Sequence, residues 1–394
     1  MQIALTLVLL KGGSLLFRTI QNLWAVNPGF DPQHVITFQA GLSPSATQTP
    51  ISTRIAYQQL LERIRQIPGV LAADLTALVP LSQNDNSGPF WVGTHQPASM
   101  AEIPRALYYW TGPDYIRTME IPLLRGRFLS PEDTTQSAQV IVVDSMLARA
   151  YFPHEDPIGQ TVTVPHWGVA RIVGVVEHVE HWRLGGSDPQ LEKPQIYASF
   201  YQLWDAWVPT FRMGLTIAVR TPLEVSTVIP AIKAAVYGAD GDQPVYNVRT
   251  MQEIVSASMA SQRLPMALLS AFAVLARLLA YVGIYGVISY SMTQRIRELG
   301  IRIALGAVKR DVLGMVIGQG LKLAAAGVAI GAIAALVLTR LLSSFFRLLF
   351  GVRANDPLTF VAVSFVLLGA ALLACYFPAR RAASVDPMVA LRHD

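Results

Sequence analysis

One short stretch of the chain has the residue types of a metal site. It reads Glu177-His178-Val179-Glu180-His181, and zinc binds histidine nitrogen and carboxylate oxygen. We expect a strand here, so His178 and Glu180 share one face while Glu177 and His181 share the other. The stretch also lacks the H-E-x-x-H spacing of helical zinc sites. The pattern therefore favours a solvated strand end, and we assign no metal ligand.

A second group has the residue types of a serine hydrolase. Asp144, Ser145 and His154 lie close together in the chain, but no G-x-S-x-G turn surrounds the serine. An Asp-Ser pair just before a helical pattern is typical of a helix N-cap. We therefore expect a capping role for Asp144-Ser145, assign no catalytic residue and do not expect an enzyme.

The sequence has no P-loop, the motif by which many proteins bind nucleotides. There is no G-x-x-x-x-G-K-[ST] loop, whose backbone N–H groups and lysine bind phosphates in P-loop proteins. We therefore expect no cofactor in this chain and no ATPase activity by that route.

The net charge is +5, but the basic residues lie beside apolar runs and form no patch interleaved with aromatic residues, so we expect no nucleic-acid partner. Cys375 is the single cysteine, which excludes an intramolecular disulfide.

Composition indicates that part of the chain is embedded in lipid. Of the 394 residues, 52% are hydrophobic and only 14% are charged, whereas soluble proteins average about 25% charged residues. The apolar excess lies near the start and in the last third of the chain. A more polar block therefore separates the membrane-embedded parts.

Four apolar runs are expected to form transmembrane helices. They occupy residues 1–23, about 264–289, 312–342 and 359–377, and a helix needs roughly 20 residues to cross a bilayer. Lys11 interrupts the first run and Arg277 the second, and the sequence assigns neither a role. The first run lacks the basic start of a signal peptide, so we expect an uncleaved helix.

The block between the first two spans, residues 24–262, is expected to form an α+β domain. Alternating strand and helix patterns run through it. We predict strands at 35–40, 70–78, 105–110, 140–143, 161–164, 171–179, 195–199, 215–219 and 244–248. We predict helices at 53–67 and 223–236. The last helix and strand repeat the opening strand-helix-strand pattern, which indicates a weak internal duplication.

An aromatic cluster in this block carries two alternative interpretations. It consists of Tyr197, Phe200, Tyr201, Trp204 and Trp207. The cluster either lines a cleft for an apolar ligand or belongs to the core of the domain.

Small residues recur at every fourth position in the third predicted span. The pairs are Gly314 with Gly318 and Gly327 with Gly331. Such spacing lets two helix backbones approach closely. The glycines therefore predict helix packing, either between two copies of the chain or against its own spans.

The segment between the second and third spans is charged and amphipathic. Leu299 and Ile303 lie on one side of a predicted helix, and Arg295, Glu298 and Arg302 lie on the other. A helix with such an apolar stripe beside the membrane is expected to dock onto a partner.

These sequences resemble permeases of the MacB/FtsX type. RELGIRIALGA at residues 297–307 is similar to the coupling region of that family, which reads much like REIGIRxALGA. Residues 112–133, 142–160 and 242–254 resemble its periplasmic core domain, and the tail at 378–394 resembles its closing sequence. Because the matches follow the order of the family, the chain resembles such a permease, or one half of a duplicated orphan permease.

The resemblance divides the chain into a first transmembrane helix, a periplasmic core domain and an FtsX-like permease domain at residues 263–394. Basic residues concentrate in the coupling segment, 290–311, and in the tail, 378–394. The positive-inside rule places both in the cytoplasm. Four spans then put the core domain in the periplasm or outside, with the protein in the bacterial inner membrane.

The resemblance also implies a function. It implies a permease subunit of an ABC-type transporter that relays the ATP-driven motion of a separate ATPase to the periplasmic domain, for export or efflux. The implied docking residues are Arg295, Arg297, Glu298, Leu299, Gly300, Arg302, Ile303, Leu305 and Gly306. Further implied partners are a second copy or a paired permease half, membrane lipid, and a periplasmic adaptor or cell-wall hydrolase.

Two alternatives to a transporter remain at this point. One is a non-transporting transmembrane regulator of a periplasmic cell-wall enzyme. The other is a membrane-anchored enzyme or ligand-binding protein that uses the periplasmic block.

Overall fold

A computed structural model gives the structure of the chain. It describes residues 27–260, apart from residues 96, 98, 100–102, 166, 183, 185–191, 212–213 and 238–243, and isolated helical residues between 267 and 372. The chain divides into two compact units. One is Val26–Ala260, and the other combines Met1–Ala25 with Ser261–Asp394.

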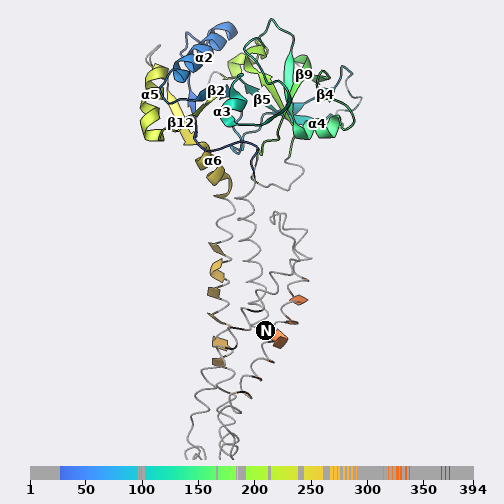
Figure 1. Ribbon diagram of the computed structural model, residues 1–394, viewed down its shortest axis with the longest axis vertical. Coiled ribbons are helices and arrows are strands. Elements are labelled where there is room, and N and C mark those ends of the chain that lie inside the picture. The colour runs from blue at the N-terminus through green and yellow to red at the C-terminus, as the bar shows by residue number, and fades with distance from the viewer. Residues whose placement is uncertain are drawn as a thin grey trace, which may run out of the picture. The chain divides into compact units, whose positions relative to one another are not determined.

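The described part of the unit Val26–Ala260 contains a twelve-stranded sheet (Figure 1). Its strand order is β12-β1-β11-β2-β5-β10-β7-β9-β8-β4, with β3 beside β5 and β6 beside β9. The strands are β1 (Val35–Ala40), β2 (Ala72–Thr76), β3 (Ser87–Pro89), β4 (Trp91–Val92), β5 (Arg105–Thr111), β6 (Leu123–Gly126), β7 (Val140–Asp144), β8 (Thr161–Val164), β9 (Gly168–Val176), β10 (Gln195–Ser199), β11 (Thr216–Arg220) and β12 (Val245–Thr250). The helices are α2 (Pro50–Arg65), α3 (Tyr115–Met119), α4 (Ser145–Tyr151), α5 (Val225–Tyr237) and α6 (Met251–Ser258), with short 3-10 turns η2 (Phe200–Gln202) and η3 (Val208–Phe211).

The first lobe of this unit consists of β12-β1-β11-β2 with α2 and α5. Its strands are all antiparallel. In chain order it is β1-α2-β2 and then β11-α5-β12, which is a split β-α-β arrangement of the ferredoxin-like type. The predicted repetition of the strand-helix-strand pattern therefore corresponds to two matching halves of one lobe.

The second lobe is inserted between β2 and β11. It carries the remaining strands, among which β10 is parallel to β5 and β9 is parallel to β7. A single residue pair, Thr76 with Thr111, links β2 to β5 in the ladder. The β-ladder between β2 of the first lobe and β5 of the second therefore consists of this one residue pair.

Helix α2 illustrates how the sequence builds the core of the first lobe. Thr49 caps the helix by accepting a hydrogen bond from the Ser52 N–H at 3.0 Å, and Pro50 fits the first turn because its missing N–H has no helical partner. Buried Tyr57, Leu60, Leu61 and Ile64 then recur at helical spacing. This apolar stripe packs α2 onto the sheet beside α5, and Figure 1 shows both helices at one end of the domain, with α4 near β4 and β9 at the other.

The predicted long elements of the domain are confirmed. The strands expected at 35–40, 161–164 and 195–199 have the same bounds in the structure, and the helices expected at 53–67 and 223–236 are α2 and α5 with shifted ends. The structure adds β3, β4, β6, α3 and α6. These elements are too short for a hydrophobic period to register in the sequence.

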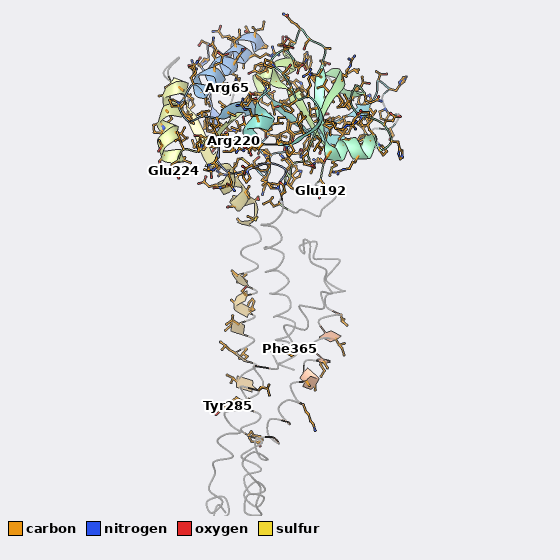
Figure 2. All side chains as sticks on the ribbon, in the orientation of Figure 1. Arg65, Glu192, Arg220, Glu224, Tyr285 and Phe365 are labelled. Carbon is orange, nitrogen blue, oxygen red and sulfur yellow. The ribbon has the colours of Figure 1, made fainter. Side chains whose placement is uncertain are left out.

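The described residues after Ala260 are helical. No helix within these described stretches combines the length and the apolar composition of a membrane span. Most residues of the four predicted spans lie outside the described residues, so the spans stay predictions. Among the described residues after Ala260, several large apolar side chains are exposed, from 40% at Leu372 to 72% at Phe365, which Figure 2 labels.

Candidate functional site

The predicted ATPase-docking residues, Arg295 to Gly306, lie outside the described residues. The same holds for Gly331. Gly314, Gly318 and Gly327 are helical, and a β-carbon added to Gly314 or Gly318 would meet no atom within 4 Å. Docking and helix packing therefore stay predictions, and the described side chains that can form a site lie in the unit Val26–Ala260.

The stretch Glu177–His181 is not the solvated strand end that its sequence favours. Strand β9 ends at Val176, and the chain after it packs back into the domain, leaving His181 only 3% exposed. His178 Nδ1 lies 2.5 Å from Asp144 Oδ2. The prediction is wrong because these residues follow the strand and find buried partners from other elements.

The two histidines have separate partners and opposite pKa shifts. Burial lowers the pKa of His181, which suits a neutral ring donating from Nε2 to the Asn84 carbonyl at 2.7 Å and accepting at Nδ1 from the Tyr109 hydroxyl at 2.6 Å. Burial alone would lower the pKa of His178 too, but the Asp144 carboxylate outweighs it and raises that pKa. The hydrogen bonds of the two histidines thus hold this stretch against other parts of the domain, which is a structural role.

The hydrolytic residue types are not joined in the structure. Asp144 caps α4 as predicted, because its Oδ1 accepts a hydrogen bond from the Leu147 N–H at 2.9 Å. Ser145 Oγ donates to Glu177 Oε1 at 2.9 Å, and His154 is exposed. Among the described contacts, none joins Ser145 to a histidine, so this arrangement does not form a Ser-His relay.

The aromatic cluster is divided between different surroundings. Tyr197 stacks on Tyr109 with ring centres 4.7 Å apart, and Phe200 lies in the hydrophobic core. Trp204 is 49% exposed and lines a cavity of about 230 Å³ together with Trp167. The core interpretation is therefore correct for Tyr197 and Phe200, and the cluster does not form one apolar cleft.

Arg220, at the end of β11, joins the start of the domain to α3. Its Nε donates to the Thr118 carbonyl at 2.8 Å, its Nη2 to the Asp31 carbonyl at 3.0 Å and its Nη1 to the Gln33 carbonyl at 3.1 Å. Its Nη1 also lies 3.2 Å from Glu120 Oε1, and the side chain is only 7% exposed. Figure 2 marks the place of Arg220 in the domain. The sequence analysis missed this residue, since no motif marks an arginine at a strand end.

Asp74 is a second buried ionisable residue that the sequence analysis missed. Its carboxylate accepts hydrogen bonds from the N–H groups of Leu75 at 2.8 Å and Asp114 at 2.5 Å. Burial raises the pKa of Asp74 to about 7, although those N–H groups and Arg65 oppose the shift. A β-carbon at Gly112 would lie 1.9 Å from Asp74 Oδ1. Only glycine therefore leaves room for the carboxylate at this corner.

A polar groove of about 390 Å³ lies between the sheet of the first lobe and a segment of the second lobe. Its floor includes Thr37, Gln39 and Thr216, which alternate along their strands with residues that pack in the core. Val79 and residues 81–84 of the second lobe form one wall, and residues of β12 and α6 complete the lining. The groove is therefore assembled from parts of both lobes.

Backbone irregularities shape this groove. The register of β1 against β12 shifts between Thr37 and Gln39, and Asn247 on β12 has a left-handed φ of 53°. Leu81 and Gln83 in the wall from the second lobe each have a φ of 62°. Non-glycine residues in this conformation concentrate at functional sites, because the surrounding structure must hold them there. The groove is therefore the candidate ligand site of the described domain.

Two family models match the chain. One describes a MacB-like periplasmic core domain and covers residues 5–250, and the other describes an FtsX-like permease C-terminal domain and covers residues 270–387.

Curated relatives carry related descriptions. The macrolide export ATP-binding/permease protein MacB of Agrobacterium fabrum is 25% identical over 342 residues, which cover 84% of this chain and 50% of the relative. The pyoverdine export ATP-binding/permease protein PvdT of Pseudomonas savastanoi is 28% identical over 284 residues, which cover 68% of this chain and 40% of the relative. The chain spans about half the length of the curated relatives it matches, or less.

Among solved structures, the periplasmic region of MacB from Actinobacillus actinomycetemcomitans matches with a TM-score of 0.40 and 17% identity. The match covers 61% of this chain and 97% of that structure.

Proposed function

The chain belongs to the family of permeases that join a MacB-like periplasmic core domain to an FtsX-like C-terminal domain, and from this premise we propose that it is the permease subunit of an ABC-type exporter. The observation that carries the proposal is the pair of family matches, which follow one another along the chain at residues 5–250 and 270–387. In this proposal the chain moves a substrate or a partner and is not itself an enzyme.

We place the protein in the bacterial inner membrane, with four spans and the unit Val26–Ala260 in the periplasm. Support comes from large apolar side chains exposed on helical residues, such as Phe272 at 54% and Ile333 at 64%. Groups of exposed apolar residues mark surfaces that lipid or another protein covers. The basic residues of the coupling segment and the tail support a cytoplasmic location for both.

A separate ATPase subunit supplies the energy in this proposal. The relatives named above are ATP-binding/permease proteins of which the chain spans half or less, and the sequence has no P-loop. The amphipathic segment with Leu299 and Ile303 offers an apolar stripe for the ATPase. ATP binding and hydrolysis are therefore assigned to the partner.

The periplasmic domain is proposed to receive motion through its two chain ends. At the first end, Arg220 holds Asp31 and Gln33 against β11 and α3. At the other end, α6 starts from a capping box in which Thr250 and Glu253 exchange hydrogen bonds at 3.0 and 3.1 Å. These ties would carry a displacement at either end into the folded lobe.

The test is reconstitution of this 394-residue chain with candidate ABC-type ATPase subunits, chosen first from any that are encoded beside its gene. We expect the two proteins to co-purify, and the ATP turnover of the ATPase to change when the permease is present. An ATPase that neither binds the chain nor changes its turnover would contradict the proposal. A cell-wall hydrolase activated by the chain, with no substrate moved, would instead favour the regulatory alternative.

A further inference from the structure

The polar groove has a lining that discriminates between ligand classes. Four of its lining side chains are carboxamides, namely Gln39, Gln83, Asn84 and Asn247. No aromatic ring and no carboxylate lines the groove among the described residues. Sites for drug-sized apolar ligands are lined mainly by hydrophobic and aromatic side chains. Val79, Leu81, Ile254 and Ala257 add aliphatic surface, so the groove suits a ligand that carries polar groups beside small aliphatic ones.

One positively charged side chain, that of Arg249 on β12, lines the groove. The backbone carbonyl of Arg249 accepts a hydrogen bond from the Thr37 hydroxyl at 3.2 Å. Its guanidinium is exposed and has no ion-pair partner among the described residues. A guanidinium binds carboxylates through two parallel N–H donors. An anionic group on a ligand would thus meet one positive charge and no opposing negative charge in the described lining.

The carboxamide side chains of the groove also restrict which ligands would fit it. Asn247 Nδ2 donates to Gln39 Oε1 at 2.8 Å, which orients both amide groups at the edge of the groove. This contact leaves the Gln39 amide N–H donors and the Asn247 carbonyl oxygen available within the described structure. A side-chain amide offers the same donor and acceptor as a peptide bond. The pattern therefore matches a ligand with peptide bonds near its anionic end.

We propose that this groove binds the C-terminal end of a short peptide, with the terminal carboxylate on Arg249 and the preceding peptide bonds on Gln39 and Asn247. A groove of about 390 Å³ lies within the roughly 300–1,000 Å³ range of small-ligand sites. The inference goes beyond the proposed transport function, because it concerns binding that needs neither nucleotide nor an ATPase.

The test uses the full-length chain in detergent and two probes that differ only at one end. Calorimetric titration compares tri-alanine with tri-alanine amide, which lacks the terminal carboxylate. We expect the free acid to bind about tenfold more tightly, the usual effect of a charge-assisted hydrogen bond. Arg249→Gln should remove this preference. Arg117→Gln, which changes an exposed arginine on α3 outside the groove, should keep it.

A second variant cancels the net positive charge of the groove lining and keeps the size of the groove. Gln39→Glu places a carboxylate beside Asn247, so it should weaken binding of tri-alanine more than binding of the amide. Failure of tri-alanine to bind, equal affinity for the two peptides, or an acid preference that survives in Arg249→Gln would each overturn the proposal. All three outcomes can occur while the permease still stimulates its ATPase, so they leave the proposed function intact.

Discussion

Burial of the Asp74 carboxyl group should make the stability of the unit Val26–Ala260 depend on pH. Burial raises its pKa from 3.8 to about 7. Between these values the folded domain holds a proton that the unfolded chain has released, so the free energy of unfolding should fall as pH rises through this window. One such group contributes at most about 1.4 kcal/mol per pH unit. Asp74→Asn should flatten the profile, measured by urea unfolding at several pH values, and an unchanged slope would rule out this assignment.

Arg220 is the residue on which the start of the domain depends. Its guanidinium donates to three backbone carbonyls from two separate segments. Arg220→Met keeps much of the packing but removes these donors, so we expect a loss of about 2–4 kcal/mol in the free energy of unfolding.

The matched control for Arg220 is Arg125→Met. Arg125 pairs with Asp156, and the two side chains are 55% and 53% exposed. Exposed ion pairs contribute about 0–1 kcal/mol, so this variant should unfold almost as the original chain does. If urea unfolding gives equal losses in the free energy of unfolding for both variants, the contacts of Arg220 contribute no more stability than an exposed ion pair does.

The proposed partnership with an ATPase is tested most directly in the amphipathic coupling segment. Leu299 lies on the stripe that a partner groove would bury, whereas Lys309 lies in the basic flank. Leu299→Asp places a charge in an apolar interface, which costs several kcal/mol if it stays unpaired. We expect it to abolish co-purification of the ATPase, and we expect Lys309→Gln to preserve it. Co-purification that is unchanged in Leu299→Asp would remove docking from this segment.

The proposed orientation of the chain in the membrane rests on its basic segments and can be tested by cysteine labelling. In a background with Cys375→Ser, a maleimide that cannot cross membranes should label Gln136→Cys in intact spheroplasts but not Ser384→Cys. Gln136 is exposed in the described domain, whereas neighbouring Ser137 is half-buried and accepts a hydrogen bond from Gln202 at 2.9 Å. Detergent permeabilisation is the control that should expose Ser384→Cys. Labelling of Ser384→Cys from outside would reverse the proposed topology.

The sequence by itself determined the long elements of the domain and the family of the chain. Strand β1 is a short, mostly apolar run that is buried on both faces, helix α2 has apolar residues at helical spacing, and the family motifs are contiguous. Only the tertiary structure decided the partners of the buried charges. His178 reaches Asp144 across 34 positions of sequence, and Arg220 reaches Thr118 and Asp31 across 102 and 189 positions. The polar groove likewise draws on both lobes. A local pattern of apolar residues indicates which face of an element is buried. It does not identify the side chain that contacts this face, because that contact depends on how elements far apart in the chain pack together.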